Sequence, residues 1–175
     1  LRWPVDEVVM VDLDKDVVEV CQRLLPTWND GATDDPRLKL VIGDARKYLV
    51  DEPGKFDVIV LDISDPIEAG PAVHLYTKEF YDIVKSKLNE GGVVVTQSGP
   101  AGLFNFKECF TAIHNTLQQS FDHVSAFSTS IPSFGSEWGF NLAFDGALSP
   151  VDSWPASKIQ IPFPLSHYDG GTHVR

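Results

Sequence analysis

Acidic side chains end three of the apolar runs in this sequence. Asp12, Asp44 and Asp62 each follow a run rich in Val, Ile and Leu, and Asp65 comes three residues after Asp62. In open α/β sheets, ligands bind beyond the carboxyl ends of the strands, so these runs deliver several carboxylates to one edge. Carboxylates that project together repel one another, and a bound cation relieves that repulsion. The pattern therefore predicts a site for a positively charged ligand at this edge.

The strongest constellation is the segment Asp62-Ile63-Ser64-Asp65-Pro66. Asp, Ser and Pro also make ordinary turns, so a turn without a function stays as the alternative. An amine ligand with an unperturbed pKa of about 10.4 arrives protonated, and it cannot attack an electrophile until a base removes its proton. Asp62 is therefore the candidate group that holds an amine substrate and accepts its proton.

The two earlier carboxylates are candidates for binding a nucleoside. Asp12 is placed to accept hydrogen bonds from both ribose hydroxyls of an adenosine, although an acid at this point can instead cap the next helix. Asp14 suits the capping task better. Asp44, which follows Gly43, is placed either to recognise an adenine amino group or to serve as a turn or cap carboxylate.

The composition agrees with a cationic ligand. Lys and Arg number 14 against 25 Asp and Glu, which gives a formal net charge of −11. The negative electrostatic field of such a protein disfavours binding of nucleic acid and attracts small cations, although an excess of acidic residues can also simply keep a protein soluble. Phe134 and Trp138, in a loop between two β-rich runs, can form an apolar and cation-binding wall for an alkyl-ammonium chain, or they can simply pack the loop.

Metal and membrane sites have no support in the sequence. The two cysteines and five histidines lack the spacing that places ligands around one metal ion, so we expect no metal. No stretch approaches the roughly 18 consecutive apolar residues of a membrane span, and no basic and apolar leader opens the chain. We therefore expect a soluble cytoplasmic protein that does not bind membranes.

Six β-rich runs alternate with helical patterns along the chain. The first four carry consecutive Val, Ile and Leu, as buried parallel strands do, and the last two are joined directly, as an antiparallel edge pair is. Helices are expected after Asp14, after Thr77 and from Asn105. Strand alternating with helix predicts an α/β fold with a doubly wound, mostly parallel sheet. The expected strands are Glu7 to Val11, Leu38 to Ile42, Phe56 to Leu61, Gly92 to Gln97, His123 to Ser130 and Trp138 to Phe144.

One domain is expected over residues 1–147, followed by an irregular tail over residues 148–175 that contains four prolines. A nucleotide-binding α/β domain normally opens with a strand, a Gly-rich turn and a helix. Nothing of that form precedes Glu7. We therefore expect the fold to lack the first strand and the Gly-rich turn.

Five segments resemble, in their order and spacing, the polyamine aminopropyltransferases, the spermidine synthase family. They read Val-Asp-Leu-Asp at 11–14, Ile-Gly-Asp-Ala at 42–45, Leu-Asp-Ile-Ser-Asp-Pro at 61–66, Leu-Tyr-Thr-Lys-Glu-Phe-Tyr at 75–81 and Val-Thr-Gln at 95–97. The resemblance covers about residues 8–144 and returns weakly at 167–169 and 173. Residues 68–71 and 97–102 are most similar to the thermospermine synthase branch.

This resemblance implies a Rossmann-like fold of the class I methyltransferase type and a transferase of polyamine biosynthesis. Such an enzyme moves an aminopropyl group from its co-substrate, decarboxylated S-adenosylmethionine, to a polyamine and releases methylthioadenosine, without a further cofactor. The implied product is of the spermidine, spermine or thermospermine type, and the implied assembly is a homodimer or larger homo-oligomer. By position, Asp12 matches the ribose-binding acid of the family, and Asp44 and Ala45 match the adenine-binding pair. Asp62 matches the catalytic acid, and Asp65 matches a carboxylate that holds an acceptor ammonium. The acceptor pocket is matched by Gln97, Phe134 and Trp138.

The chain departs from the family pattern at several points. Many relatives have Glu where Asp12 stands and Tyr where Phe134 stands. The family's Gly-rich motif and its small N-terminal β domain would precede Leu1. We therefore expect the isolated chain to be a partial synthase without turnover.

Two other functions stay open. A methyltransferase that uses intact S-adenosylmethionine would share the fold and the nucleoside-binding acids, but the clustered Asp62 and Asp65 would repel the carboxylate of that donor. A synthase-like subunit that binds polyamines without catalysis is the second alternative. A dinucleotide dehydrogenase is disfavoured because its Gly-rich fingerprint turn is absent from the sequence.

Overall fold

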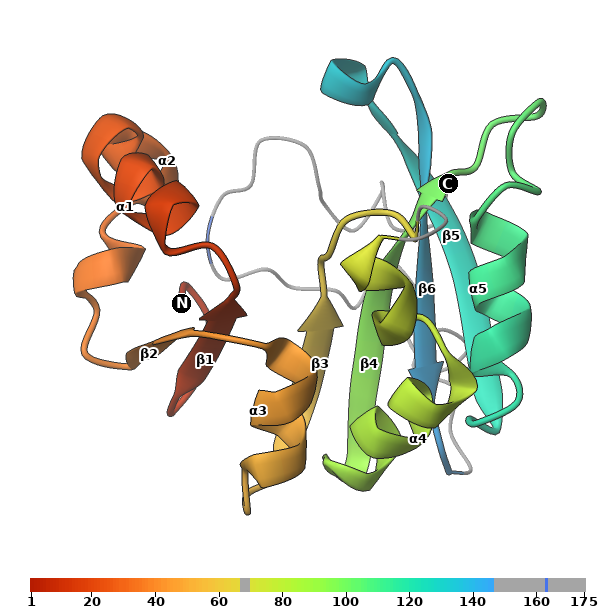
Figure 1. The fold of residues 1–175 in the computed structure, drawn as a ribbon, viewed down its shortest axis with the longest axis horizontal. Helices are drawn as coiled ribbons and strands as arrows, with labels where there is room; N and C mark the ends of the chain where they lie inside the picture. Colours follow the sequence, from red (N-terminus) through yellow and green to blue (C-terminus); the bar gives the residue numbers. More distant parts are fainter. Residues whose placement is uncertain (67–69, 147–162, 164–175) are drawn as a thin grey trace. The chain divides into compact units, whose positions relative to one another are not determined.

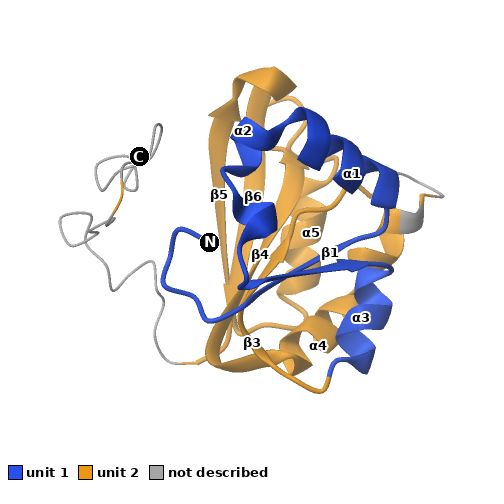
Figure 2. Cartoon of the chain, turned by 90° about the vertical axis from the view of Figure 1, so that its left-hand side faces the viewer, with its two compact units in different colours: residues 1–52 blue, residues 53–175 orange. Residues whose placement is uncertain are grey.

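The computed structural model describes residues 1–66, 70–146 and Phe163 of the 175-residue chain. The chain divides into two compact units, residues 1–52 and residues 53–175 (Figure 2). Apart from Phe163, the expected tail at 148–175 lies outside the described residues, and its boundary at 147 stays a prediction.

The first unit is built around a two-stranded parallel sheet. Its strands pair in register, and Asp12 lies opposite Ile42 at the carboxyl end of the sheet. Asp14 caps the helix that follows β1 by accepting hydrogen bonds from two backbone N–H groups of its first turn, as predicted. The elements are β1 (Val8–Asp12), α1 (Lys15–Leu24), α2 (Pro26–Asn29), the 3-10 helix η1 (Ala32–Asp34), β2 (Leu38–Ile42) and α3 (Ala45–Asp51) (Figure 1).

The second unit contains a mixed four-stranded sheet in the order β3-β4-β6-β5. The pair β3 and β4 is parallel, whereas β6 runs antiparallel to both β4 and β5. The predicted antiparallel pair at the sheet edge is therefore confirmed. The elements are β3 (Phe56–Leu61), the 3-10 helix η2 (Pro71–Leu75), α4 (Lys78–Ser86), β4 (Leu88–Pro100), α5 (Phe110–Leu117), β5 (His123–Ile131), the 3-10 helix η3 (Pro132–Phe134) and β6 (Ser136–Phe144).

Helices α4 and α5 cover one face of the four-stranded sheet (Figures 1 and 2). On that face Ile59 and Leu61 of β3 are buried, whereas Val58 and Val60, which point the other way, are 57% and 64% exposed. The apolar run of β3 predicts burial on both faces, and the described residues cover only one of them. The covered core consists of Ile59, Leu61, Phe80, Tyr81, Val84, Val94, Ile113, Leu117 and Ala143.

The largest differences from the expected element boundaries are in β4 and α5, whereas β1, β5 and β6 differ from expectation by one or two residues. The segment before Gly92, expected to close a helix, belongs to β4, because Leu88 pairs with Phe56 and the strand continues past an irregularity in the pairing. The helix expected from Asn105 begins only at Phe110. The backbone N–H of Asn105 instead donates to the carbonyl of Gly102, which makes a turn of the preceding residues.

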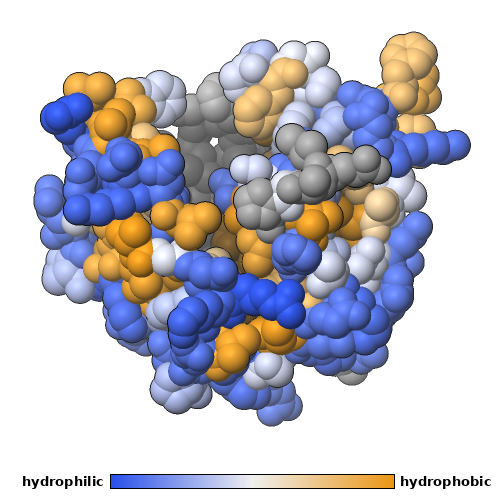
Figure 3. All heavy atoms as spheres, viewed as in Figure 1, coloured by the Kyte–Doolittle hydropathy of each residue, from blue (hydrophilic) through white to orange (hydrophobic). Residues whose placement is uncertain are grey.

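On the face seen in Figure 3, hydrophilic residues cover most of the molecule and leave apolar patches between them. Within the described residues, no helix is both long and apolar enough to cross a bilayer.

Gly139 of β6 is expected to tolerate no side chain. A Cβ atom at this position would lie 2.3 Å from Cδ2 and 2.6 Å from Cε2 of Phe110, the first residue of α5. Gly139→Ala should lower the free energy of unfolding by about 1–3 kcal/mol, because the ring or the helix must move. Urea unfolding of the full-length protein measures this effect.

The matched control for this substitution is Gly43→Ala. A Cβ atom at Gly43 would meet nothing within 4 Å, so the same change should shift the free energy of unfolding by less than about 0.5 kcal/mol. Equal losses for Gly139→Ala and Gly43→Ala would contradict the packing of α5 on β6.

Candidate functional site

A cavity of about 300 Å³ lies at the carboxyl end of β3 and β4. In Figure 1 the segment after β3 runs toward this end of β4. The sequence singled out five of the seven residues around the cavity, and all five come from the second unit. The lining residues are Asp62, Ile63, Ser64, Asp65, Gln97, Phe134 and Trp138.

Two carboxylates give this cavity its charge. The Asp62 residue is exposed and Asp65 is half-buried, and within the described residues neither forms an ion pair with Lys, Arg or His. Asp65 Oδ1 accepts a hydrogen bond of 3.0 Å from Gln97 Nε2. The cavity therefore presents negative charge that no described cation balances, which favours a positively charged ligand.

The aromatic wall of the cavity combines Phe134 of η3 with Trp138, which lies in β6 and not in the loop expected from the sequence. The Phe134 and Trp138 rings lie 4.4 Å apart between centroids and are tilted by 48°. Trp138 Nε1 donates a 3.0 Å hydrogen bond to Gln97 Oε1, which fixes the indole beside the carboxylates. Phe134 is 55% exposed, so its ring is free to contact a ligand. Aromatic faces next to carboxylates are suited to an alkyl-ammonium chain.

Gln97 connects the parts of this site. Its side chain is buried on β4, and its Nε2 lies 2.5 Å from the carbonyl oxygen of Ile63 as well as near Asp65. Its Oε1 accepts from the backbone N–H of Gly99 and from the Trp138 indole. The amide therefore ties the turn after β3 to the aromatic wall.

Sequence reasoning missed two residues next to the cavity. The Tyr76 hydroxyl contacts the turn after β3. In the sequence, Tyr76 stood out only as part of the family-like segment 75–81, and no role was predicted for it. Gly99 has a φ of +75°, and a Cβ atom there would lie 3.1 Å from Cβ of Cys109 and 3.4 Å from Oδ1 of Asp65. The positive φ and the close approach together require glycine. The expected strand ended at Gln97, so the only sequence signal for Gly99 was its place in the segment 97–102.

The first unit holds the other predicted acids. Asp12 is half-buried, and its Oδ1 accepts from the backbone N–H of Asp14 at 2.8 Å. Asp44 caps α3 with Oδ1, which accepts from the backbone N–H of Lys47 at 2.9 Å, and Ala45 is the first residue of that helix. The capping interpretation of Asp44 is confirmed, and the nucleoside-binding roles of Asp12, Asp44 and Ala45 stay predictions.

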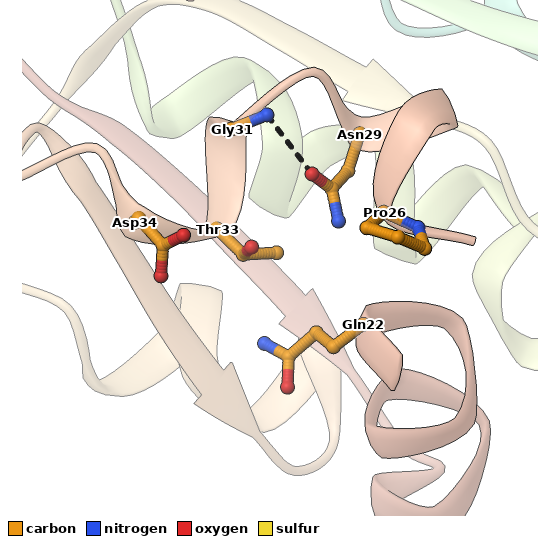
Figure 4. Close-up of a pocket in the computed structure, with 6 residues that line it drawn as sticks. All are labelled: Gln22, Pro26, Asn29, Gly31, Thr33 and Asp34. Atoms are coloured by element: carbon orange, nitrogen blue, oxygen red, sulfur yellow. Dashed lines mark hydrogen bonds between the residues drawn. The ribbon is translucent and has the colours of Figure 1, made fainter. Parts of the chain in front are cut away.

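The first unit also has a cavity of about 420 Å³ that contains none of the predicted site residues (Figure 4). Asp34 is the acidic residue in its lining, and one amide oxygen, Asn29 Oδ1, already accepts a hydrogen bond from the backbone N–H of Gly31. The residues around this cavity are Gln22, Pro26, Asn29, Gly31, Thr33 and Asp34.

Within the part of the chain that the structure describes, no three His, Cys, Asp or Glu residues gather where they could hold a metal ion.

Comparison with known proteins gives consistent matches. Residues 1–150 match the spermine/spermidine synthase domain. The chain is 48% identical over 142 residues to the thermospermine synthase ACAULIS5 of Arabidopsis thaliana, a match that covers 81% of this chain and 42% of the relative. It is 45% identical over 143 residues to a polyamine aminopropyltransferase of Aeropyrum pernix, covering 81% of this chain and 45% of the relative. The chain thus spans about half the length of the curated relatives it matches.

Solved structures agree with these matches. A spermidine synthase in complex with the transition-state analogue AdoDATO superposes with a TM-score of 0.87 at 25% identity, over 99% of this chain and 58% of that structure. The spermidine synthase of Thermotoga maritima superposes with a TM-score of 0.82 at 24% identity. This match covers 99% of this chain and 57% of that structure. The predicted fold class, a Rossmann-like α/β fold with parallel strands and an antiparallel edge, is confirmed.

Proposed function

Because the chain belongs to the spermine/spermidine synthase domain family, we propose that the protein acts in polyamine biosynthesis as an aminopropyltransferase. It transfers an aminopropyl group from decarboxylated S-adenosylmethionine to an amine of a polyamine and releases methylthioadenosine. The observation that carries this proposal is the cavity of the second unit, in which two carboxylates without a described ion-pair partner face an aromatic wall.

Asp62 prepares the nucleophile. The acceptor amine arrives as an ammonium, and the carboxylate of Asp62 holds it and takes its proton. The free amine then attacks the methylene next to the donor sulfonium. A carbon–nitrogen bond forms, the carbon–sulfur bond breaks, and its electron pair stays on sulfur, which becomes the thioether of methylthioadenosine. Alignment and deprotonation supply most of the acceleration, since a sulfonium is already a good leaving group.

The rest of the cavity selects a polyamine. Asp65 pairs with a second positive nitrogen of the acceptor, while Phe134 and Trp138 contact the methylene chain and the neighbouring ammonium. A neutral amine, or one with a single charge, gains only part of this binding free energy. The acceptor is therefore a substrate with at least two charged nitrogens.

The nucleoside part of the donor is assigned to the first unit. Asp12 binds the ribose hydroxyls, and Asp44 with Ala45 binds the adenine. The described hydrogen bonds of both acids use only Oδ1, which leaves Oδ2 of each carboxylate to accept from the ligand. No cofactor beyond the co-substrate is needed for this displacement.

Product identification tests the proposed function. The full-length gene product is incubated with decarboxylated S-adenosylmethionine and with putrescine, spermidine or spermine in turn, and the products are identified by mass spectrometry. We expect methylthioadenosine and an acceptor that carries one additional aminopropyl group. A methylated product from intact S-adenosylmethionine would show a methyltransferase instead, and polyamine binding without turnover would show a binding subunit.

Two further properties follow from the family resemblance. We infer a homodimer or larger homo-oligomer, which light scattering of the full-length protein measures. We also infer a cytoplasmic location, which cell fractionation tests.

A further inference from the structure

Tyr76 lies outside the cavity and contacts the turn that carries both acids. Its side chain is 7% exposed and is not part of the cavity lining. Its hydroxyl lies 3.1 Å from the carbonyl oxygen of Ile63 and 3.2 Å from that of Ser64, the two residues between the acids. The hydroxyl therefore holds the backbone of the turn from behind, since it donates to these carbonyls.

The same hydroxyl sets the orientation of Gln97. Because the Tyr76 proton goes to a carbonyl of the turn, its oxygen accepts from Gln97 Nε2 at 3.0 Å. With the amino group of the amide on this side, Oε1 faces the opposite way and accepts from the Trp138 indole. A flipped amide would place an amino group against the indole N–H, and both are donors.

Gln97 has no hydrogen-bonding capacity left for a ligand. Its Nε2 carries two hydrogens, and three acceptors lie within 3.0 Å of it: the Ile63 carbonyl, Asp65 Oδ1 and the Tyr76 hydroxyl. Its Oε1 already accepts from Trp138 and from the backbone N–H of Gly99. Although Gln97 lines the cavity, its amide acts on the site through these neighbours.

Burial keeps Tyr76 in its donor form. Desolvation raises the pKa of the Tyr76 hydroxyl well above its ordinary value, although the hydrogen bond from Gln97 opposes the shift, and the nearby Asp65, Cys109 and Asp62 raise the pKa further. The hydroxyl therefore stays protonated throughout the physiological pH range.

We propose that Tyr76 is a positioning residue of the acceptor site, whose hydroxyl fixes the turn between Asp62 and Asp65 and, through the amide of Gln97, the place of Trp138. It acts on the acceptor without touching it. This inference rests on the proposed function for its substrate, and it adds a determinant of acceptor affinity behind the cavity wall.

The test is Tyr76→Phe in the full-length protein, with Tyr81→Phe as its matched control. Both changes remove one buried hydroxyl, but the Tyr81 hydroxyl has no hydrogen-bond partner within the described residues. Tyr76→Phe should raise KM and the calorimetric Kd for the polyamine by about 3- to 10-fold. The KM for decarboxylated S-adenosylmethionine should stay unchanged, as should both constants in Tyr81→Phe.

A second variant guards against a general loss of folding. Gln97→Met keeps the length of the side chain and removes the amide, and it should raise the same acceptor KM. Because both groups act in one network, the double variant should lose less affinity than the product of the two single effects. Two results would overturn the proposal. One is a double variant whose loss of acceptor affinity equals the product of the two single losses, and the other is an acceptor affinity of Tyr76→Phe equal to that of Tyr81→Phe.

The binding measurement separates this inference from the proposed function. If the unmodified protein binds polyamine and Tyr76→Phe binds it equally well, the positioning role is wrong and the proposed function stands. If the unmodified protein binds no polyamine at all, the proposed function fails first.

Discussion

Asp62→Asn is expected to lower kcat by about 10²- to 10⁴-fold, because it removes the carboxylate that we propose as the base for the attacking amine. An amide has nearly the same shape as the carboxylate but cannot take up the proton at neutral pH. Steady-state kinetics of the full-length protein with decarboxylated S-adenosylmethionine and its acceptor measure the loss. Calorimetry with methylthioadenosine should give an unchanged Kd, since the proposed role places Asp62 at the amine and not at the nucleoside.

The control for this variant lies in the same strand. Asp57→Asn makes the identical substitution near the start of β3, where Asp57 accepts a 2.8 Å hydrogen bond from Asn89 Nδ2, and Asp62 follows the other end of the strand. It should leave kcat within about twofold, as surface substitutions usually do. Full activity of Asp62→Asn would remove Asp62 from the role of base, whatever the control shows.

Asp65→Asn is expected to raise KM for the polyamine by about 10- to 100-fold, since it removes a charged partner from an acceptor ammonium. The side chain amide still accepts from Gln97 Nε2 through its oxygen, so the turn keeps the bond of 3.0 Å that holds it. The value of kcat at saturating acceptor should change much less, because the proposed mechanism transfers the proton to Asp62 and not to Asp65.

An alkyl monoamine serves as the control ligand for Asp65. It has one ammonium for Asp62 and none for Asp65, so the unmodified protein and Asp65→Asn should bind it with equal Kd. A polyamine Kd that does not respond to Asp65→Asn would contradict the proposed pairing. A monoamine Kd that weakens as much as the polyamine Kd would show that the substitution disturbs the cavity in general.

The sequence predicted the elements that place the site because their signals are local. Two strands, Leu38–Ile42 and Phe56–Leu61, have the predicted bounds. Asp14 and Thr77 are the N-caps of α1 and α4, the helices expected to follow these two residues. The carboxyl ends of parallel strands meet at one edge of a sheet, which brings the residues after β3 next to Gln97 on β4. This rule explains why Asp62, Asp65 and Gln97 meet at one cavity. Phe134 and Trp138 reach the same cavity from η3 and from β6, which pairs antiparallel with β4.

Other features depend on contacts between distant segments, which the sequence pattern does not contain. The length of β4 is set by its pairing with Phe56 at one end and Trp138 at the other. The role of Tyr76 depends on carbonyls that lie 12 and 13 residues earlier in the chain. Its spacing with Phe80 is typical of core packing, and periodicity reports where a ring lies but not what its hydroxyl contacts.

The most direct measurement of the central claim is a crystal structure of the full-length protein with a polyamine and methylthioadenosine bound. We expect one polyamine nitrogen within about 3 Å of the Asp62 carboxylate, a second within about 3 Å of Asp65, and the methylene chain against Phe134 and Trp138. A polyamine bound elsewhere, with both carboxylates turned to solvent, would contradict the account.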